Sequence, residues 1–180
     1  DTTSTADDAA IAVDLVAEGF SDPVVVGRGG FGVVFRCQQR ALDRTLAVKV
    51  LTAELSPENL ERFLREQRAM GRLSGHPHIV DIYQCGVTRS GRPYLALRYC
   101  AHGSLESMIR RCGPLTWNDT LTLGVKMCGA LEMAHRLGTL HRDVKPANIL
   151  INDYDEPLLA DFGIARIAGG FETSTGVITC

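Results

Sequence analysis

Short apolar runs separated by turn residues dominate the first half of the chain and predict a β-sheet. The runs are rich in β-branched and aromatic residues, which favour strands, while glycine and proline between them mark turns. The expected strands cover residues 24–26, a second run that ends at Phe35, and residues 45–51, 79–83 and 94–97.

Three further segments carry the signals of helices. Ser56 is a favourable N-cap for a helix that ends between 71 and 77. Ser104 is expected to cap a short helix that ends near Gly113. Thr116, with Asp119 three residues on, is expected to cap a long helix that reaches about residue 137. The positions of this long helix that we expect to face the core are Leu121, Val125, Cys128, Leu131 and His135, and Met127 and Met133 are expected to belong to the core as well.

Residues 1–20 form a leader before the first strand. Residues 1–8 are small, polar and acidic, which predicts a loose segment. From Ala9 to Phe20 apolar residues alternate with acids, and this pattern is compatible with either a short helix or an extended lead-in. The chain does not begin with methionine and has no basic region before an apolar one, so we expect no signal peptide here.

Composition is that of an ordinary globular domain. The 180 residues are 45% hydrophobic, which is enough for one packed core. A formal net charge of -2 gives no reason to expect nucleic acid or an acidic membrane as a partner. No apolar run approaches the roughly 20 residues of a membrane-spanning helix. The six cysteines include no C-x-x-C pair, so we expect a cytoplasmic protein with reduced, mostly buried cysteines.

Glycines at positions 27, 29 and 32, in the pattern G-x-G-x-x-G, raise two possibilities. In a dinucleotide-binding fold this pattern opens a helix and is followed by an acid about 20 residues on. Here the glycines lead into Val33-Val34-Phe35, which favours a second strand, and Leu-Ala-Val-Lys stands at 46–49. We therefore expect a hairpin whose glycine-rich turn lets the backbone approach phosphate groups.

Lys49 lies among apolar residues in one of the expected strands. With a period of two it shares a face with Ala47, while Leu46 and Val48 lie on the other face. A buried, unpaired ammonium group is costly, so Lys49 needs an anionic partner: a nucleotide phosphate, or Glu66 of the following helix. The plainer alternatives are an exposed lysine on an edge strand, and a Glu66 that pairs with an arginine of its own helix.

The stretch His-Arg-Asp-Val-Lys-Pro-Ala-Asn at 141–148 holds an imidazole, a carboxylate, a cation and an amide. A carboxylate such as Asp143 can orient a hydroxyl nucleophile and accept its proton, and Lys145 can neutralise charge on a phosphoryl group in transit. Asn148 and Asp161, which opens an Asp-Phe-Gly turn, offer the oxygen ligands that Mg²⁺ shares with phosphates. These residue types together suit phosphoryl transfer.

In this order the motifs resemble those of the eukaryotic-like (Hanks-type) serine/threonine protein kinases, from about residue 24 to 179. Residues 62–80 and 161–178 are most similar to soluble actinobacterial members whose kinase domain precedes a regulator-like ATPase region. The resemblance implies an α+β, protein-kinase-like bilobal fold. Its β-rich N-lobe would span 21–97, and a hinge with a partial helical C-lobe, through the activation loop, would span 98–180.

The resemblance also implies what individual residues do. The activity would be transfer of the γ-phosphoryl group of Mg-ATP to serine or threonine hydroxyls of protein substrates. Asp143 would be the catalytic base and Lys145 would steady the γ-phosphate. Lys49 would hold the α- and β-phosphates while paired with Glu66. The other implied site residues are the Mg²⁺ ligands Asn148 and Asp161 and the ATP contacts Gly27, Arg28, Gly29, Gly30, Phe31, Gly32, Val34, Ala47, Lys49, Leu97, Arg98, Cys100 and Leu150.

Regulation is implied in the same way. Family members stack a regulatory column of side chains, which here would consist of Met70, Ile82, His141 and Phe162. Arg142, directly before the base, implies activation by phosphorylation of the following loop. The candidate acceptors are Thr173, Ser174 and Thr175.

The chain stops at Cys180, before the remainder of a C-lobe, so we expect a fragment that is inactive on its own. Its long helix, and the strands around Ile149 and Leu158, would then present apolar faces. The chief rival function is a catalytically inert pseudokinase or nucleotide-binding scaffold, and a small-molecule phosphotransferase is a third. The presence of both Lys49 and Asp143 favours the kinase.

Overall fold

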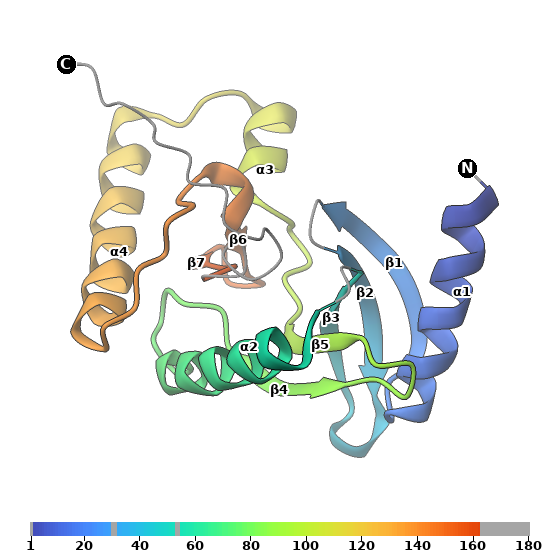
Figure 1. The fold of residues 1–180 in the computed structure, drawn as a ribbon. Helices are drawn as coiled ribbons and strands as arrows, with labels where there is room; N and C mark the ends of the chain where they lie inside the picture. Colours follow the sequence, from blue (N-terminus) through green and yellow to red (C-terminus); the bar gives the residue numbers. More distant parts are fainter. Residues whose placement is uncertain (1, 30–31, 53–54, 163–180) are drawn as a thin grey trace.

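The computed structural model describes residues 2–29, 32–52 and 55–162, which form two parts (Figure 1). The first part is a five-stranded antiparallel sheet with helices α1 (Thr2–Ala17) and α2 (Pro57–Met70). The second holds helices α3 (Leu105–Cys112) and α4 (Trp117–Arg136) around a two-stranded sheet. This arrangement confirms the expected α+β fold, with a β-rich part followed by a helical one.

The large sheet contains five strands in the order β1-β2-β3-β5-β4. They are β1 (Ser21–Gly29), β2 (Gly32–Gln39), β3 (Arg44–Leu51), β4 (Ile82–Val87) and β5 (Pro93–Arg98), and the short 3-10 helix η1 (Arg40–Leu42) joins β2 to β3. The hairpin expected at the glycines is confirmed, since β1 pairs with β2 and Gly29 lies opposite Gly32. A Cβ on Gly32 would lie 2.1 Å from the carbonyl oxygen of Val50, so only glycine fits there.

Strand β4 begins at Ile82, three residues later than expected. Residues 79 and 80 are extended but pair elsewhere. Ile79 forms a parallel bridge with Leu159, and the Val80 N–H donates to the Leu159 carbonyl at 3.0 Å. A run of β-branched residues predicts an extended backbone without saying which strand it joins.

The two faces of the sheet differ as the alternation along β3 predicts. Leu46, Val48 and Val50 are fully buried in a cluster with α1. Ala47 and Lys49 point to the opposite face and are half-buried. The face that carries Lys49 is therefore free of α1 and turns toward the second part of the molecule.

The leader is a helix that packs on the sheet. Helix α1 starts at Thr2, so the prediction of a loose segment over residues 1–8 is wrong from Thr2 onward. For residues 9–20 the sequence allowed either a helix or an extended segment, and the structure shows a helix up to Ala17. Ile11, Leu15 and Phe20 are buried against the same sheet face as Val48. Tertiary packing of this apolar face stabilises the helix, although its polar N-terminal residues alone do not predict one.

Leu15→Ala is expected to lower the free energy of unfolding by about 2–5 kcal/mol, because it opens a cavity between α1 and the sheet. Leu15 has no exposed surface, whereas the neighbouring Val16 is 54% exposed. Val16→Ala is the matched control, with an expected change within about 0.5 kcal/mol. Urea unfolding followed by circular dichroism measures both. Equal effects would mean that α1 does not pack as described.

Helix α2 begins where the sequence predicts. Ser56 is its cap, accepting a hydrogen bond from the Asn59 N–H at 3.3 Å. Phe63 is buried together with Leu51 and Leu95, which fixes α2 beside the cleft face of the sheet. The short 3-10 helix η2 (Gly71–Leu73) continues it.

The expected caps of α3 and α4 are also confirmed. Ser104 Oγ accepts from the Ser107 N–H, and Thr116 Oγ1 accepts from the Asp119 N–H, each at 3.2 Å. Gly113 ends α3 with a positive φ of 89°. Serine and threonine side chains satisfy the first backbone donors of a helix, and glycine readily adopts the left-handed turn at its end.

The core face of α4 matches the expected one only in part. Met127 is buried as expected, together with Ala130 and Ala134, which were not expected, and this face packs toward β7. In the expected stripe, Leu131 is partly buried, and the exposed members are Leu121, Val125, Cys128 and His135. The alanines allow a close approach between helix and strand, and close packing rather than side-chain size selects the buried face.

The second sheet pairs β6 (Ile149–Ile151) with β7 (Pro157–Leu159), after the short 3-10 helix η3 (Pro146–Asn148). Ile149 and Leu158 are buried, so the expectation that these strands present an apolar face is wrong. Helix α4 does present one: Trp117, Leu121 and Val125 are 74%, 49% and 74% exposed.

Cys37 and Cys100 are buried, and burial raises the pKa of the Cys37 thiol to about 12 and that of Cys100 to about 11. Cys112 and Cys128 are exposed, so the expectation of mostly buried cysteines is only partly correct; Cys180 lies outside the described residues. A thiol with a raised pKa is protonated near neutral pH and is a poor nucleophile.

Iodoacetamide at about pH 8 is therefore expected to alkylate Cys112 and Cys128 well before Cys37 or Cys100 in the folded protein. Peptide mass spectrometry over a time course measures the order. Denatured protein, in which all four react at similar rates, is the control. Early labelling of Cys100 in the native state would contradict its burial.

Candidate active site

Hydrogen bonds join the loop that starts at His141 to the segment before Asp161. His141 is buried; its Nδ1 accepts from the Asp143 N–H at 3.3 Å, so its Nε2 donates to the Ala160 carbonyl at 2.7 Å. The Ala160 N–H in turn donates to the Asn148 carbonyl at 2.8 Å. The two polar stretches singled out in the sequence therefore lie side by side.

Asp143 is at the centre of a small network. Its Oδ2 accepts from Lys145 Nζ at 2.7 Å and from Asn148 Nδ2 at 3.0 Å. Asn148 Nδ2 also donates to the Asp143 carbonyl at 2.8 Å. Lys145 chiefly, with Asn148 adding to it, holds the pKa of Asp143 below its ordinary value. Asp143 is thus an ionised acceptor at neutral pH, better suited to orienting a hydroxyl than to removing its proton early.

Lys49 of β3 contacts Asp161 across the cleft. The distance from Nζ to Oδ2 is 2.7 Å, and the side chains are 11% and 32% exposed. Asp161 has a φ of 63°, and Arg142, beside Asp143, has a φ of 68°. Non-glycine residues in this left-handed region are strained, and such strain concentrates at functional sites. One of the two strained residues, Asp161, is itself an acidic group of the site, and the other, Arg142, directly precedes Asp143.

The expected pair between Lys49 and Glu66 is not formed. Glu66 accepts from Arg62 Nε at 3.0 Å, one turn earlier on α2. The physical reason is that Asp161 already neutralises Lys49, while an arginine four residues away reaches Glu66 without any movement of the helix. The plainer alternative from the sequence, an i,i+4 pair within α2, describes this structure.

The expected regulatory column is assembled. Met70, Ile82 and Phe162 belong to one hydrophobic cluster that links α2, β4 and the Asp-Phe-Gly turn. The His141 ring lies 4.6 Å from the Phe162 ring, centroid to centroid. The four side chains therefore connect the two parts of the molecule behind the polar site.

Apolar side chains lie together on the face of the sheet that carries Lys49. Ala47 lies directly opposite Leu97 on neighbouring strands, and Val34 lies opposite Lys49. From the other part, Leu150 packs in one cluster with Leu97. The ATP-contacting residues predicted on the sheet and on β6 thus face a common space.

Two predicted ATP contacts point elsewhere. The Arg28 side chain pairs with Asp8 of α1, on the outer face of the sheet. The Arg98 guanidinium pairs with Asp81 at 3.0 Å, and its backbone N–H donates to the Asp81 carbonyl at 3.1 Å. Neither side chain is directed to the cleft. The predicted residues outside the described part of the chain are Gly30, Phe31, Thr173, Ser174 and Thr175.

Sequence reasoning missed Gln67. This side chain is 3% exposed and lines a small cavity with Met70, Asp161 and Phe162. It follows Phe63 by four residues and precedes Met70 by three, the spacing of one helix face. That spacing was the available signal, although a glutamine is rarely assigned to a core.

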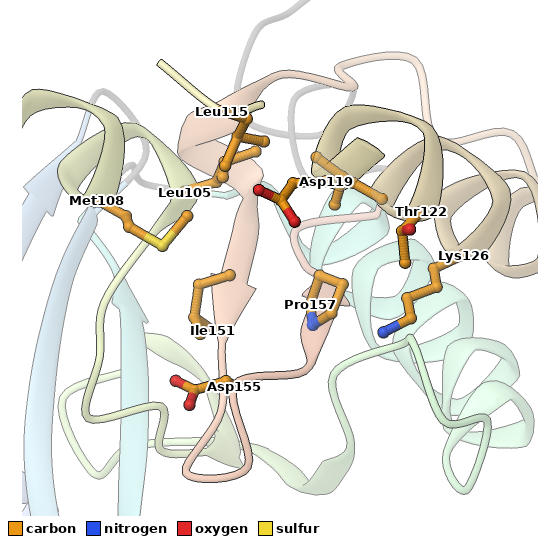
Figure 2. A pocket seen from close by; sticks show the side chains of 10 residues that line it. Leu105, Met108, Leu115, Asp119, Thr122, Lys126, Ile151, Asp155 and Pro157 are labelled. Atoms are coloured by element: carbon orange, nitrogen blue, oxygen red, sulfur yellow. The ribbon is translucent and has the colours of Figure 1, made fainter. Parts of the chain in front are cut away.

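A second hollow of about 330 Å³ lies away from this cleft, between α3, α4 and the β6–β7 turn (Figure 2). Leu105 and Met108 line it from α3, and Lys126 lines it from α4. Its lining includes none of the residues that the sequence assigned to the site. Among the described residues, no group of three or more His, Cys, Asp and Glu side chains could hold a metal ion.

Comparison with known proteins identifies the family. The model of the protein kinase domain family matches residues 20–180. The chain belongs to the protein kinase family. It is 66% identical over 168 residues to the serine/threonine-protein kinase PknK of Mycobacterium tuberculosis, covering 93% of this chain. It spans 15% of the length of that relative. The mycobacterial match confirms the resemblance to actinobacterial Hanks-type serine/threonine kinases.

Solved kinase structures agree with the geometry. The Mycobacterium tuberculosis PknI kinase domain has a TM-score of 0.69 and 32% identity, covering 82% of this chain and 60% of its own. Rad53 in complex with AMP-PNP has a TM-score of 0.70 and 25% identity, covering 83% of this chain and 39% of its own. These likenesses extend over both parts of the kinase fold. Within the described residues, no helix is both long and apolar enough to span a bilayer.

Proposed function

We propose that this chain carries the nucleotide-binding and catalytic apparatus of a protein serine/threonine kinase that uses Mg-ATP. The observation that carries the proposal is a single hydrogen-bonded unit. Asn148 donates to Asp143 at 3.0 Å through its side chain and accepts from Ala160 at 2.8 Å through its backbone. Asp161 follows Ala160 in the chain and forms an ion pair with Lys49 at 2.7 Å. Base, cation and oxygen ligands thus meet at one site.

Asp143 would accept a hydrogen bond from the serine or threonine hydroxyl and direct its oxygen at the phosphoryl group. Lys145, 2.7 Å from the same carboxylate, would remain beside the reacting oxygen. Its charge would offset the negative charge on the group being transferred.

Asn148 and Asp161 have the chemistry that Mg²⁺ requires. Both offer oxygen, and magnesium typically takes one or two protein ligands together with substrate phosphates. Because the Asn148 amide nitrogen is committed to Asp143, its oxygen is the end directed away from that carboxylate. Mg²⁺ held there would neutralise phosphate charge. Lys49, beside Asp161, would hold the α- and β-phosphates.

The nucleotide base would lie between Ala47 and Leu150. Both side chains are half-buried, as expected for residues that line an open cleft. Leu97 and Val34 extend the same apolar surface. The glycine-rich hairpin would cover the phosphates, because residues without side chains permit the closest backbone approach.

Regulation by phosphorylation is part of the proposal. Arg142 is exposed and precedes the base, so a phosphate on the following loop would find a cation there. Thr173, Ser174 and Thr175 are the proposed acceptors, by autophosphorylation. Protein substrates with serine or threonine acceptors and a cytoplasmic location remain predictions.

The test is incubation of the full-length protein with γ-labelled ATP, Mg²⁺ and casein as a general acceptor. Label is expected on the protein and on casein, and acid hydrolysis should yield phosphoserine and phosphothreonine. Chelation of the metal should abolish the labelling. Binding of ATP without any labelling would support the inert nucleotide-binding scaffold instead.

A further inference from the structure

Helix α1 lies outside the part of the chain that the kinase family shares. The family match begins at residue 20, whereas α1 spans Thr2–Ala17. The helix nevertheless runs along β1 and covers the outer face of the sheet (Figure 1). An additional element packed on the back of the glycine-rich hairpin can influence how that hairpin is held.

Three acidic residues of α1 connect it to the sheet and its β4–β5 turn: Asp7, Asp8, and Asp14, which accepts a hydrogen bond from Ser90. Asp7 forms two hydrogen bonds with the Arg92 guanidinium, at 2.9 and 2.5 Å, beside the turn between β4 and β5. Asp8 forms an ion pair with Arg28, which stands between Gly27 and Gly29 of the hairpin. The first contact is remote from the nucleotide cleft. The second reaches the segment proposed to cover the phosphates.

The Arg28 side chain lies on the α1 side of the sheet and not in the cleft. Arg28 is opposite Val33 on β2, and directly opposed residues project from the same face. Val33 is buried in the cluster with α1, which defines that face as the outer one. The Asp8 side chain is 14% exposed, and its Oδ1 is shielded from solvent. Partial shielding makes such a pair stronger than a fully solvated one.

We propose that Asp8 is a positioning residue for the nucleotide: by holding Arg28 on the outer face, it fixes the end of β1, at Gly27 and Gly29, beside the phosphates. This inference rests on the proposed use of ATP. Residues 27 and 29 are glycines and have no side chains that could restrain the backbone. The Arg28 side chain is therefore the group through which this segment is held in place. A hairpin held in advance loses less freedom when a phosphate chain binds beneath it.

The experiment measures the dissociation constants of Mg-ATP and of adenosine, by calorimetry, for full-length wild-type protein and Asp8→Asn. Adenosine has no phosphates and serves as an internal reference for the base site. Asp8→Asn is expected to weaken ATP binding about two- to fivefold, the range of a partly shielded ion pair, while adenosine binding stays the same. The ratio of the two constants is the readout, because a merely destabilised fold would weaken both ligands.

Asp7→Asn is the matched control. It removes the same charge from the same helix and breaks the contact with Arg92, yet it leaves the hairpin contact in place. Its ratio should stay much closer to that of wild type, because Asp7 acts on Arg28 only through its charge and not through a direct contact. Asp8→Glu keeps the charge and should restore most of the ATP affinity. In an Arg28→Gln background, Asp8→Asn should have no further effect, since the two act through one contact.

An unchanged ratio in Asp8→Asn, or an equal change in Asp7→Asn, would overturn the inference. Tighter ATP binding would do the same, because it would mean that a released Arg28 turns to the phosphates. Should Asp8→Asn lower the melting temperature strongly, Arg28→Gln tests the same contact from its exposed side and must shift the ratio. A wild-type protein that binds no ATP would instead count against the proposed function.

Discussion

Lys49→Met is expected to reduce phosphoryl transfer on the order of 10²- to 10³-fold, the cost of removing a preorganised charge from a water-poor site. Lys49 is 11% exposed and 2.7 Å from Asp161, on the sheet face opposite α1. Methionine keeps the apolar length of the side chain, so the packing of β3 should survive. Without the ammonium group, phosphates and Asp161 would repel one another. Initial rates with labelled ATP, together with the melting temperature, measure the effect.

Lys126→Met supplies a matched control. Lys126 also forms an ion pair, with Glu156 at 2.5 Å, but it belongs to α4 and lies outside the cleft. The chemical change is identical and its effect on the rate should be small. Turnover close to wild type in the Lys49 variant would remove Lys49 from the machinery and leave its ion pair with Asp161 a purely structural contact.

Asp143→Asn is expected to lower kcat by about 10²-fold or more and to leave the affinity for ATP little changed. Asn148 and Lys145 contact the Asp143 carboxylate directly, so its neutralisation alters the orientation of the acceptor hydroxyl. Asparagine has the same size and still accepts a hydrogen bond, but it cannot take a proton. Steady-state kinetics and ATP binding, measured on the same preparation, separate the two effects.

Asp155→Asn is the corresponding control, because this aspartate is 86% exposed, lies on the turn between β6 and β7 and forms an ion pair with His102. It should keep wild-type kinetics. A parallel loss of ATP affinity and kcat in Asp143→Asn would make Asp143 a nucleotide-binding residue rather than the base.

The sequence predicted correctly those features that the local geometry of the chain determines by itself. The alternation along β3 placed Lys49 on one face and Val48 on the other, because successive side chains of a strand must alternate. The caps at Ser104 and Thr116 were equally local. The motif order located Asp143 and Asn148 in one loop, and hydrogen bonds to the segment before Asp161 then complete the site.

It failed where two partners of similar chemistry compete. Glu66 can pair with Lys49 or with Arg62, and only the position of α2 relative to β3 decides between them. In α4 the apolar residues occupy more than one face, so periodicity could not say that Ala130 would be buried and Val125 exposed. Such choices depend on neighbouring elements, which local patterns do not contain.

The bridge between residues 79–80 and Leu159 gives the two lobes a second point of attachment. The Val80 N–H donates to the Leu159 carbonyl, and the Leu159 N–H donates to the His78 carbonyl at 2.9 Å. The covalent connection at 98–103 is the first point. Sliding or separating the lobes would break these hydrogen bonds, so the attachment restrains both movements. Met70, at the C-terminal end of α2, packs in one cluster with Ile79 and Leu159. The C-terminal end of α2 is therefore anchored at this second attachment, and we expect it to move less than the start of the helix when the two lobes shift.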